Sequence, residues 1–158
     1  MPNRFIDKPP TSKDIQTMAK RFVSIHNSKI IKCDVNDIMF IMKEANNIVM
    51  SKGIGSGQDR FRNAIKDAIV RCQVIAKDYN PFSAEKILLF IGYNNRRPLS
   101  MEEFIEISTL TDMFNNKIIP VIEMYVDDRN IDQDSIIINM LATNLGLKEI
   151  CASQHSIV

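Results

Sequence analysis

Apolar residues recur along this chain with helical spacing in some segments and as continuous runs in others. Over residues 57–77 they recur at i, i+3 and i+4, which predicts a helix with one buried stripe. That stripe contains Phe61, Ala64, Ile65, Ala68, Ile69 and Cys72. Residues 86–93 are apolar almost throughout, which is typical of a strand buried on both faces. Weaker patterns predict helices over 12–27, from about 34 and over 101–115, and strands over 47–52, 117–126 and 135–143.

This order of elements predicts an α/β (α+β) two-layer sandwich, with a mixed four-stranded sheet and helices packed mainly on one face. The loop 127–134 between the last two strands predicts that they form an antiparallel pair. Pro120 has no backbone N–H to donate, so we expect it at a sheet edge or a bulge. Ser100 and Glu103 have the spacing of a capping box and predict where the helix 101–115 begins.

The two ends of the chain lack any periodic pattern. Residues 1–10 contain three prolines and are expected to form a disordered leader, whereas residues 151–158 are expected to form a flexible tail. Between them, residues 11–150 are predicted to fold as a single domain, which suits a chain of 158 residues.

Charge and cysteine content exclude several classes of partner and compartment. The chain has 20 Lys and Arg against 19 Asp and Glu, so nothing electrostatic favours nucleic acid. It has no run of about 18 apolar residues to span a membrane and no apolar signal core. Its three cysteines are widely spaced and are typical of reduced thiols. We therefore expect a cytoplasmic protein that binds neither nucleic acid nor membrane.

A glycine-rich segment lies between the strand 47–52 and the helix 57–77, and such a turn can cradle a phosphate. Its key residues are Gly53, Gly55, Gly57 and Asp59. Gln58 stands where a G-x-G-x-x-G motif needs glycine, and the Asp59 carboxylate would repel a phosphate. The segment is therefore interpreted as a structural turn, with Ser56 as helix N-cap, and no cofactor is expected.

Asp34 and Asp37 place two carboxylates three residues apart at the start of the second helix. They can position a water or a metal ion, or they can simply cap the helix and interact with its dipole. The acidic loop 127–134 lacks the glycine and the bidentate glutamate of an EF-hand, so no metal site is predicted there.

The segment 30–60 as a whole resembles the C-terminal domain of FtsZ, the tubulin-like bacterial cell-division GTPase. In that family a loop of pattern N-x-D-x-x-D follows a long helix, and a helix, a strand and a turn ending in Gly-Glu-Asp-Arg come next. The counterparts here are Asp34 and Asp37, then residues 57–60, which read GQDR. Residues 141–146, LATNLG, resemble the final strand of the family. The resemblance covers about residues 15–146 and implies the fold of that domain.

The same resemblance implies where a partner would bind. The GTPase domain and its Gly-Gly-Gly-Thr-Gly loop are missing, so the chain is not expected to be an enzyme by itself. In FtsZ filaments the aspartate loop enters the nucleotide site of the next subunit, so Asp34 and Asp37 are candidates to assist hydrolysis in trans. Lys29 and Lys32 replace a glycine and an asparagine of the family, and their charges suit phosphate binding and capping more than hydrolysis.

The resemblance therefore implies a non-enzymatic interaction module for FtsZ or another tubulin-like GTPase, acting in filament assembly or cell division. Self-association and an origin as a fragment of a longer GTPase are further alternatives. A different interpretation is a small ring-forming α/β ligand-binding protein or enzyme of chorismate-mutase-like architecture, with sites between subunits. Fold class alone does not distinguish these interpretations. Identification of the proteins that co-purify with the chain would distinguish them.

Overall fold

The computed structural model describes residues 3–25, 35–115, 118 and 120–149. Its centre is a five-stranded mixed sheet of order β1-β2-β6-β4-β5. The strands are β1 (Arg4–Ile6), β2 (Ile48–Ser56), β6 (Ser135–Thr143), β4 (Lys86–Tyr93) and β5 (Val121–Val126). β4 and β5 run parallel, whereas the other neighbouring pairs are antiparallel. This confirms the mixed α/β class.

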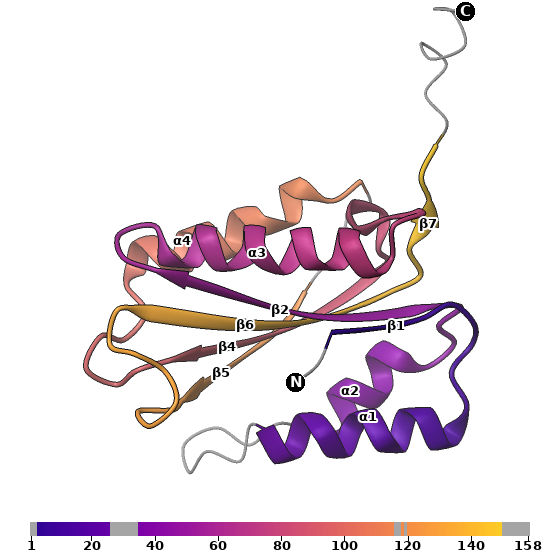
Figure 1. Ribbon diagram of the computed structural model, residues 1–158, viewed down its shortest axis with the longest axis horizontal. Helices are drawn as coiled ribbons and strands as arrows, with labels where there is room; N and C mark the ends of the chain where they lie inside the picture. The colour runs from indigo at the N-terminus through magenta and orange to yellow at the C-terminus, as the bar shows by residue number, and fades with distance from the viewer. Residues whose placement is uncertain (1–2, 26–34, 116–117, 119, 150–158) are drawn as a thin grey trace, which may run out of the picture.

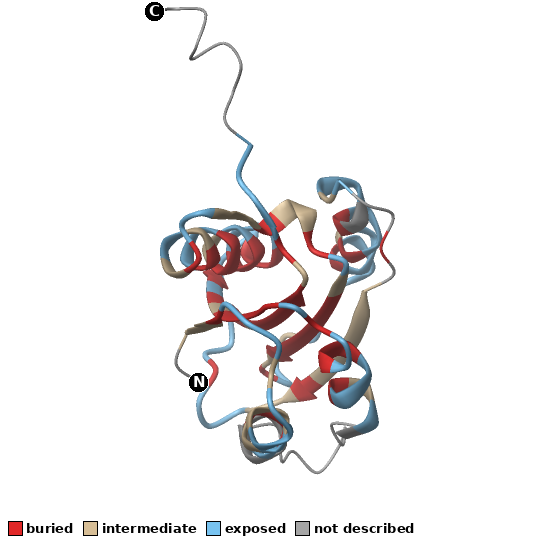
Figure 2. Ribbon diagram, turned by 90° about the vertical axis from the view of Figure 1, so that its right-hand side faces the viewer, coloured by how far each residue is buried: buried red, intermediate tan, exposed pale blue. Residues whose placement is uncertain are grey.

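Helices cover both faces of this sheet, as Figure 1 shows. α3 (Arg60–Ile75) and α4 (Met101–Thr109) lie on one face, and α1 (Ser12–Ile25) and α2 (Val35–Met42) on the other. The expectation of two layers was therefore wrong. The reason lies in β4, where Leu89 packs toward α3 while Leu88 and Phe90 pack toward α2, so both faces need a cover. Figure 2 shows the resulting buried residues above and below the sheet.

Short elements complete the fold. Two 3₁₀ helices follow β3 and α4, and a small two-stranded sheet joins β3 to β7. Their bounds are β3 (Tyr79–Asn80), η1 (Pro81–Ser83), η2 (Leu110–Met113) and β7 (Gly146–Leu147).

Part of the expected disordered leader is a strand. β1 pairs antiparallel with β2, with Arg4 opposite Met50 and Ile6 opposite Ile48. Ile6 is buried against the α1/α2 side of the sheet. A strand of three residues is too short to give a periodic pattern, so its existence depends on the neighbouring strand. The predicted tail 151–158 lies outside the described residues.

The glycine-rich segment is mostly strand rather than turn. A Cβ atom on Gly53 would lie 1.9 Å from the carbonyl oxygen of Ala64, and one on Gly55 would lie 1.9 Å from that of Arg60. These glycines therefore let α3 lie directly on β2. The turn proper is at Gly57, whose φ is 82°.

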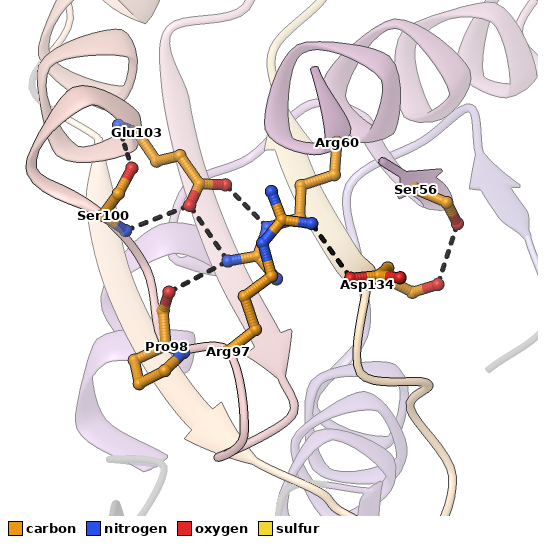
Figure 3. Close-up of polar contacts among 8 residues, drawn as sticks. Ser56, Arg60, Arg97, Pro98, Ser100, Glu103 and Asp134 are labelled. Atoms are coloured by element: carbon orange, nitrogen blue, oxygen red, sulfur yellow. Dashed lines mark hydrogen bonds and ion pairs between the residues drawn. The ribbon is translucent and has the colours of Figure 1, made fainter. Parts of the chain in front are cut away.

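The predicted helix cap at this turn was also wrong. Asp59 immediately precedes α3, but its side chain makes no capping hydrogen bond. The Ser56 hydroxyl instead lies 2.8 Å from that of Ser135 and joins β2 to β6 (Figure 3). A strand that extends to Ser56 places this side chain too early in the chain to cap α3.

The last two long strands are not neighbours, because β4 lies between β5 and β6. The loop 127–134 therefore crosses the end of β4 instead of closing a hairpin. Pro120 comes directly before the edge strand β5, as its missing N–H predicted. The capping box at Ser100 and Glu103 and the buried stripe of α3 are also confirmed.

Candidate functional site

Of the charged residues predicted to contact a partner, only Asp37 can be located. Lys29, Lys32 and Asp34 lie outside the described residues. Asp37 lies in the first turn of α2 and is partly exposed. A carboxylate there suits the positive end of the helix dipole, which agrees with the capping interpretation. Its role toward a partner remains a prediction.

α2 exposes two large apolar side chains close to Asp37. Met39 is 50% exposed and Phe40 is 60% exposed. The Lys86 ammonium lies 4.4 Å from the centre of the Phe40 ring and donates a hydrogen bond to the Phe40 carbonyl at 3.3 Å. This contact ties α2 to the start of β4. Asp37 and Phe40 are three residues apart and therefore lie on the same side of the helix.

A buried ion pair holds α4 against α3 (Figure 3). The Arg60 side chain is 0% exposed, and its Nε and Nη2 donate to the two carboxylate oxygens of Glu103 at 2.8 and 2.9 Å. Nη2 also donates to the Pro98 carbonyl at 3.0 Å. The periodicity of α3 had placed Arg60 outside the buried stripe. It is buried because the first turn of α4, with its carboxylate, packs over it.

Glu103 serves two elements at once. It accepts the backbone N–H of Ser100 at 3.0 Å and so closes the capping box while it binds Arg60. Burial alone would raise the pKa of Glu103, but hydrogen bonds from Arg60 and Ser100 outweigh burial and hold this pKa below its usual value. The carboxylate therefore stays ionised at neutral pH and keeps α4 in place.

The α4 helix exposes three large apolar side chains, those of Met101, Phe104 and Ile105. Glu106 faces α3, where its carboxylate lies 3.6 Å from the Arg62 guanidinium. Phe104 is two residues away, about 200° around the helix, so it lies on the flank that faces away from α3. Met101 and Ile105 are 76% and 60% exposed. These side chains bury little within the domain and are available to a partner.

Between α4 and α2 runs the unpaired edge of the sheet. Figure 2 shows α4, β5 and α2 one below another along one side of the molecule. The Asp127 N–H donates to the Tyr93 carbonyl at 3.0 Å, which fixes the direction of the backbone groups along β5. Ile122, Met124 and Val126 consequently direct their N–H and C=O groups away from β4. These groups have no hydrogen-bond partner within the described part of the chain.

We call this surface the β5 face. It consists of Met39 and Phe40 of α2, Ile122, Met124 and Val126 of β5, and Met101, Phe104 and Ile105 of α4. It combines exposed apolar side chains on the two helices with half-buried apolar side chains and bare backbone donors and acceptors on β5, which is a composition suited to protein association. The patterns of the sequence did not predict this surface. The signal that could have found it is the pair Met101 and Ile105, which fall outside the buried stripe of their helix.

A second candidate site is a cleft on the α1/α2 side of the sheet. It has a volume of about 290 Å³, and Lys52, Tyr125, Asp127 and Asn139 are among its lining residues. Burial raises the pKa of Tyr125 to about 12, so the phenol stays protonated. The Asp127 carboxylate accepts the backbone N–H groups of its own turn. The Tyr125 phenol therefore cannot serve this cleft as a base at neutral pH.

Two other features of the described residues bear on the class of site. The described residues contain no cluster of histidine, cysteine, aspartate and glutamate side chains that could hold a metal ion. None of the helices placed in the structure is long and apolar enough to cross a bilayer.

Comparison with known proteins supports the fold. No family model and no curated protein matches the chain. Several solved structures match it. FtsZ of M. jannaschii, as a W319Y mutant, aligns with a TM-score of 0.57 at 16% identity. The alignment covers 86% of this chain and 42% of that one. The chain has the fold of an FtsZ C-terminal-like domain.

Relatives of FtsZ give the same result. The helical model of a four-stranded filament of TubZ-Bt aligns with a TM-score of 0.57 at 11% identity, over 90% of this chain and 36% of that one. A protofilament of Bacillus thuringiensis serovar israelensis TubZ in the GTPγS form aligns with a TM-score of 0.53 at 8% identity. That alignment covers 84% of this chain and 34% of the TubZ chain. The chain thus spans well under half the length of the FtsZ and TubZ chains. At these identities the likeness concerns fold, not activity.

Proposed function

We propose that this chain is a non-enzymatic, cytoplasmic interaction module that binds a tubulin-like GTPase and modulates its assembly. The observation that carries the proposal is the β5 face, where exposed apolar side chains of α2 and α4 flank an unpaired strand edge. Such side chains gain free energy only when a partner covers them, at roughly 25 cal/mol for each Å² of apolar surface buried.

The similar solved structures support the choice of partner. FtsZ and TubZ are described in them as a dimer, a protofilament and a four-stranded filament. A module with their fold, but covering 42% or less of their length, is suited to occupy one end of such an assembly. In this proposal the module caps the filament, and Asp34, Asp37, Lys29 and Lys32 approach the partner's nucleotide site.

The test is filament sedimentation of a tubulin-like GTPase from the same cells, with GTP, as the module is titrated in. Wild type is expected to lower the pelleted fraction and to change GTP turnover. Phe104→Asp and Ile105→Asp should abolish both effects, since they place a charge on the β5 face. Val74→Asp is the matched control, because Val74 is 71% exposed on α3, away from that face.

Charged-loop variants test the second part of the proposal. Asp34→Asn should keep binding but alter GTP turnover, and Lys32→Glu should weaken binding, more so at low salt where screening is least. Equal effects of Phe104→Asp and Val74→Asp would refute the β5 face. If sedimentation and GTP turnover with both loop variants matched those with wild type, Asp34 would be left as a helix cap. Saturable binding of GTP to the module alone, measured by calorimetry, would overturn the non-enzymatic assignment.

A further inference from the structure

The two edges of the central sheet differ in how their backbone groups are used. On the β2 side, β1 pairs with Ile48 and Met50. Beyond it, the Asn3 side chain accepts the N–H of Lys52 at 3.0 Å and the Asp67 carboxylate accepts that of Ile54 at 3.0 Å. Side chains and a short strand thus occupy the donors that another strand would need. This edge is closed to strand addition.

The β5 edge has no such protection among the described residues. Ile122, Met124 and Val126 each present one donor and one acceptor outward. β5 contains no proline and no lysine, the residues that commonly block an edge. Its one charged residue, Glu123, belongs to the alternate set whose backbone groups face β4. Within the described part of the chain, nothing blocks the addition of another strand along β5.

We propose that β5 pairs antiparallel with β5 of a second copy of this chain, across a two-fold axis that passes through Met124. In this register the three outward residues of each copy all find partners. Ile122 stands opposite the second copy's Val126, Met124 opposite the second copy's Met124, and Val126 opposite the second copy's Ile122. Each facing pair exchanges two hydrogen bonds, so the joint forms six. A shift by two residues in either direction leaves only two facing pairs and four bonds.

The side chains of β5 fit the same register. All three facing pairs are apolar on the α3/α4 side of the sheet, which favours cross-strand packing. On the other side, Glu123 stands opposite the second copy's Tyr125, so no like charges are directly opposed. The strand is thus complementary to itself, as a two-fold interface requires.

The α4 helix adds to this joint. A two-fold axis perpendicular to the sheet keeps each α4 on the same face, so the two α4 helices meet side by side. Phe104 lies on the flank of α4 that faces away from α3, and Met101 and Ile105 extend its exposed apolar surface. Pairing therefore covers the β5 edge and the flank of α4 beside it.

This inference rests on the geometry of β5 and does not depend on the proposed GTPase partner. The two associations use the same surface, so they exclude each other, and the monomer is the form that would bind the GTPase. Self-association would then set how much module is free to act.

Disulfide trapping tests the register directly. Met124→Cys is made with Cys33→Ser and Cys151→Ser, so that only the buried Cys72 remains. Facing residues of a hydrogen-bonded pair have Cα atoms about 5.5 Å apart, within the disulfide range of about 4.4–6.8 Å. Oxidation should convert most of this variant to a covalent dimer. Ile122→Cys in the same background is the matched control, because the two Ile122 residues lie four positions apart, roughly 13 Å, and should remain uncoupled.

Sedimentation equilibrium provides a second measurement. Wild type should show a concentration-dependent monomer–dimer equilibrium, and Met124→Lys should remain monomeric because it opposes two ammonium groups. Val74→Lys, on α3, should dimerise as wild type does, and circular dichroism confirms that each variant is folded. A wild type that is monomeric up to its solubility limit would overturn the inference, as would equal trapping of Met124→Cys and Ile122→Cys. Either result would leave the filament assay, and the GTPase proposal, unaffected.

Discussion

Replacing Glu103 by alanine should destabilise the domain by about 3–5 kcal/mol, because it leaves the buried Arg60 guanidinium without its counter-charge. Arg60 is 0% exposed, and two of its hydrogen bonds end on that carboxylate, at 2.8 and 2.9 Å. Its Nη1 atom already lacks a partner among the described residues, so the loss of this carboxylate adds to an existing deficit of acceptors. The free energy of unfolding, from urea titration followed by circular dichroism, measures the cost.

The same two helices provide a matched control. Arg62 and Glu106 also join α3 to α4, but at 3.6 Å and with side chains 56% and 30% exposed. Glu106→Ala should therefore cost about 0–1 kcal/mol. Ser100→Ala, at about 1 kcal/mol, removes the other half of the capping box, in which the Ser100 hydroxyl accepts the Glu103 N–H, and shows what one cap hydrogen bond contributes. If Glu103→Ala cost no more than Glu106→Ala, the argument that burial decides the effect would be refuted.

Acid provides an independent test of the same pair. The pKa of Glu103 is held below its usual value in the folded protein. Its contribution is therefore complete above the unfolded-state pKa, about 4.3, and is lost as the pH falls through the lower folded-state pKa. The gap in unfolding free energy between wild type and Glu103→Ala should narrow over that range. A gap that stayed constant from neutral pH to below pH 3 would contradict the assignment.

Three further predictions concern the packing of α3. Gly53→Ala should lower the melting temperature strongly, because its Cβ would lie 1.9 Å from the Ala64 carbonyl oxygen. Overpacking of this kind typically costs about 1–3 kcal/mol or more. An unchanged melting temperature would mean that α3 does not lie on β2. Ile65→Ala should cost roughly 2–5 kcal/mol in urea unfolding, since it removes a buried side chain and leaves a cavity. Burial raises the pKa of the Cys72 thiol to about 12, so a thiol reagent at pH 8 should label it only after unfolding, and rapid labelling of folded protein would refute its burial.

Local pattern identified the elements that carry a long periodic signal. The stripe on α3, the apolar run of β4 and the capping box at Ser100 are all present in the structure. β1 escaped because three residues among prolines hold no period. Gly53 and Gly55 were assigned to a turn because glycine serves turns and close packing equally well, and only the position of α3 distinguishes the two.

The site was less accessible to sequence reasoning. The carboxylate that neutralises Arg60 is 43 residues away along the chain. A local sequence pattern therefore could not predict that this arginine is buried. The β5 face is assembled from three separate segments, and its defining property is a set of backbone groups that lack a neighbour. Such a property depends on strand order, which periodicity does not encode. Of the charged loop predicted from the family resemblance, Asp37 alone falls within the described residues.

The position of β6 has a consequence for biosynthesis. This strand lies in the middle of the sheet, where it pairs with β2 on one side and β4 on the other. Yet it is the last of the sheet's strands to leave the ribosome, and Ser135 must pair with Ser56, 79 residues earlier in the chain. Until then, β2 and β4 each expose an edge that nothing fills, and such edges invite aggregation. The central sheet therefore cannot close until β6 has been synthesised, and these two edges stay open to other chains from the synthesis of β2 until then.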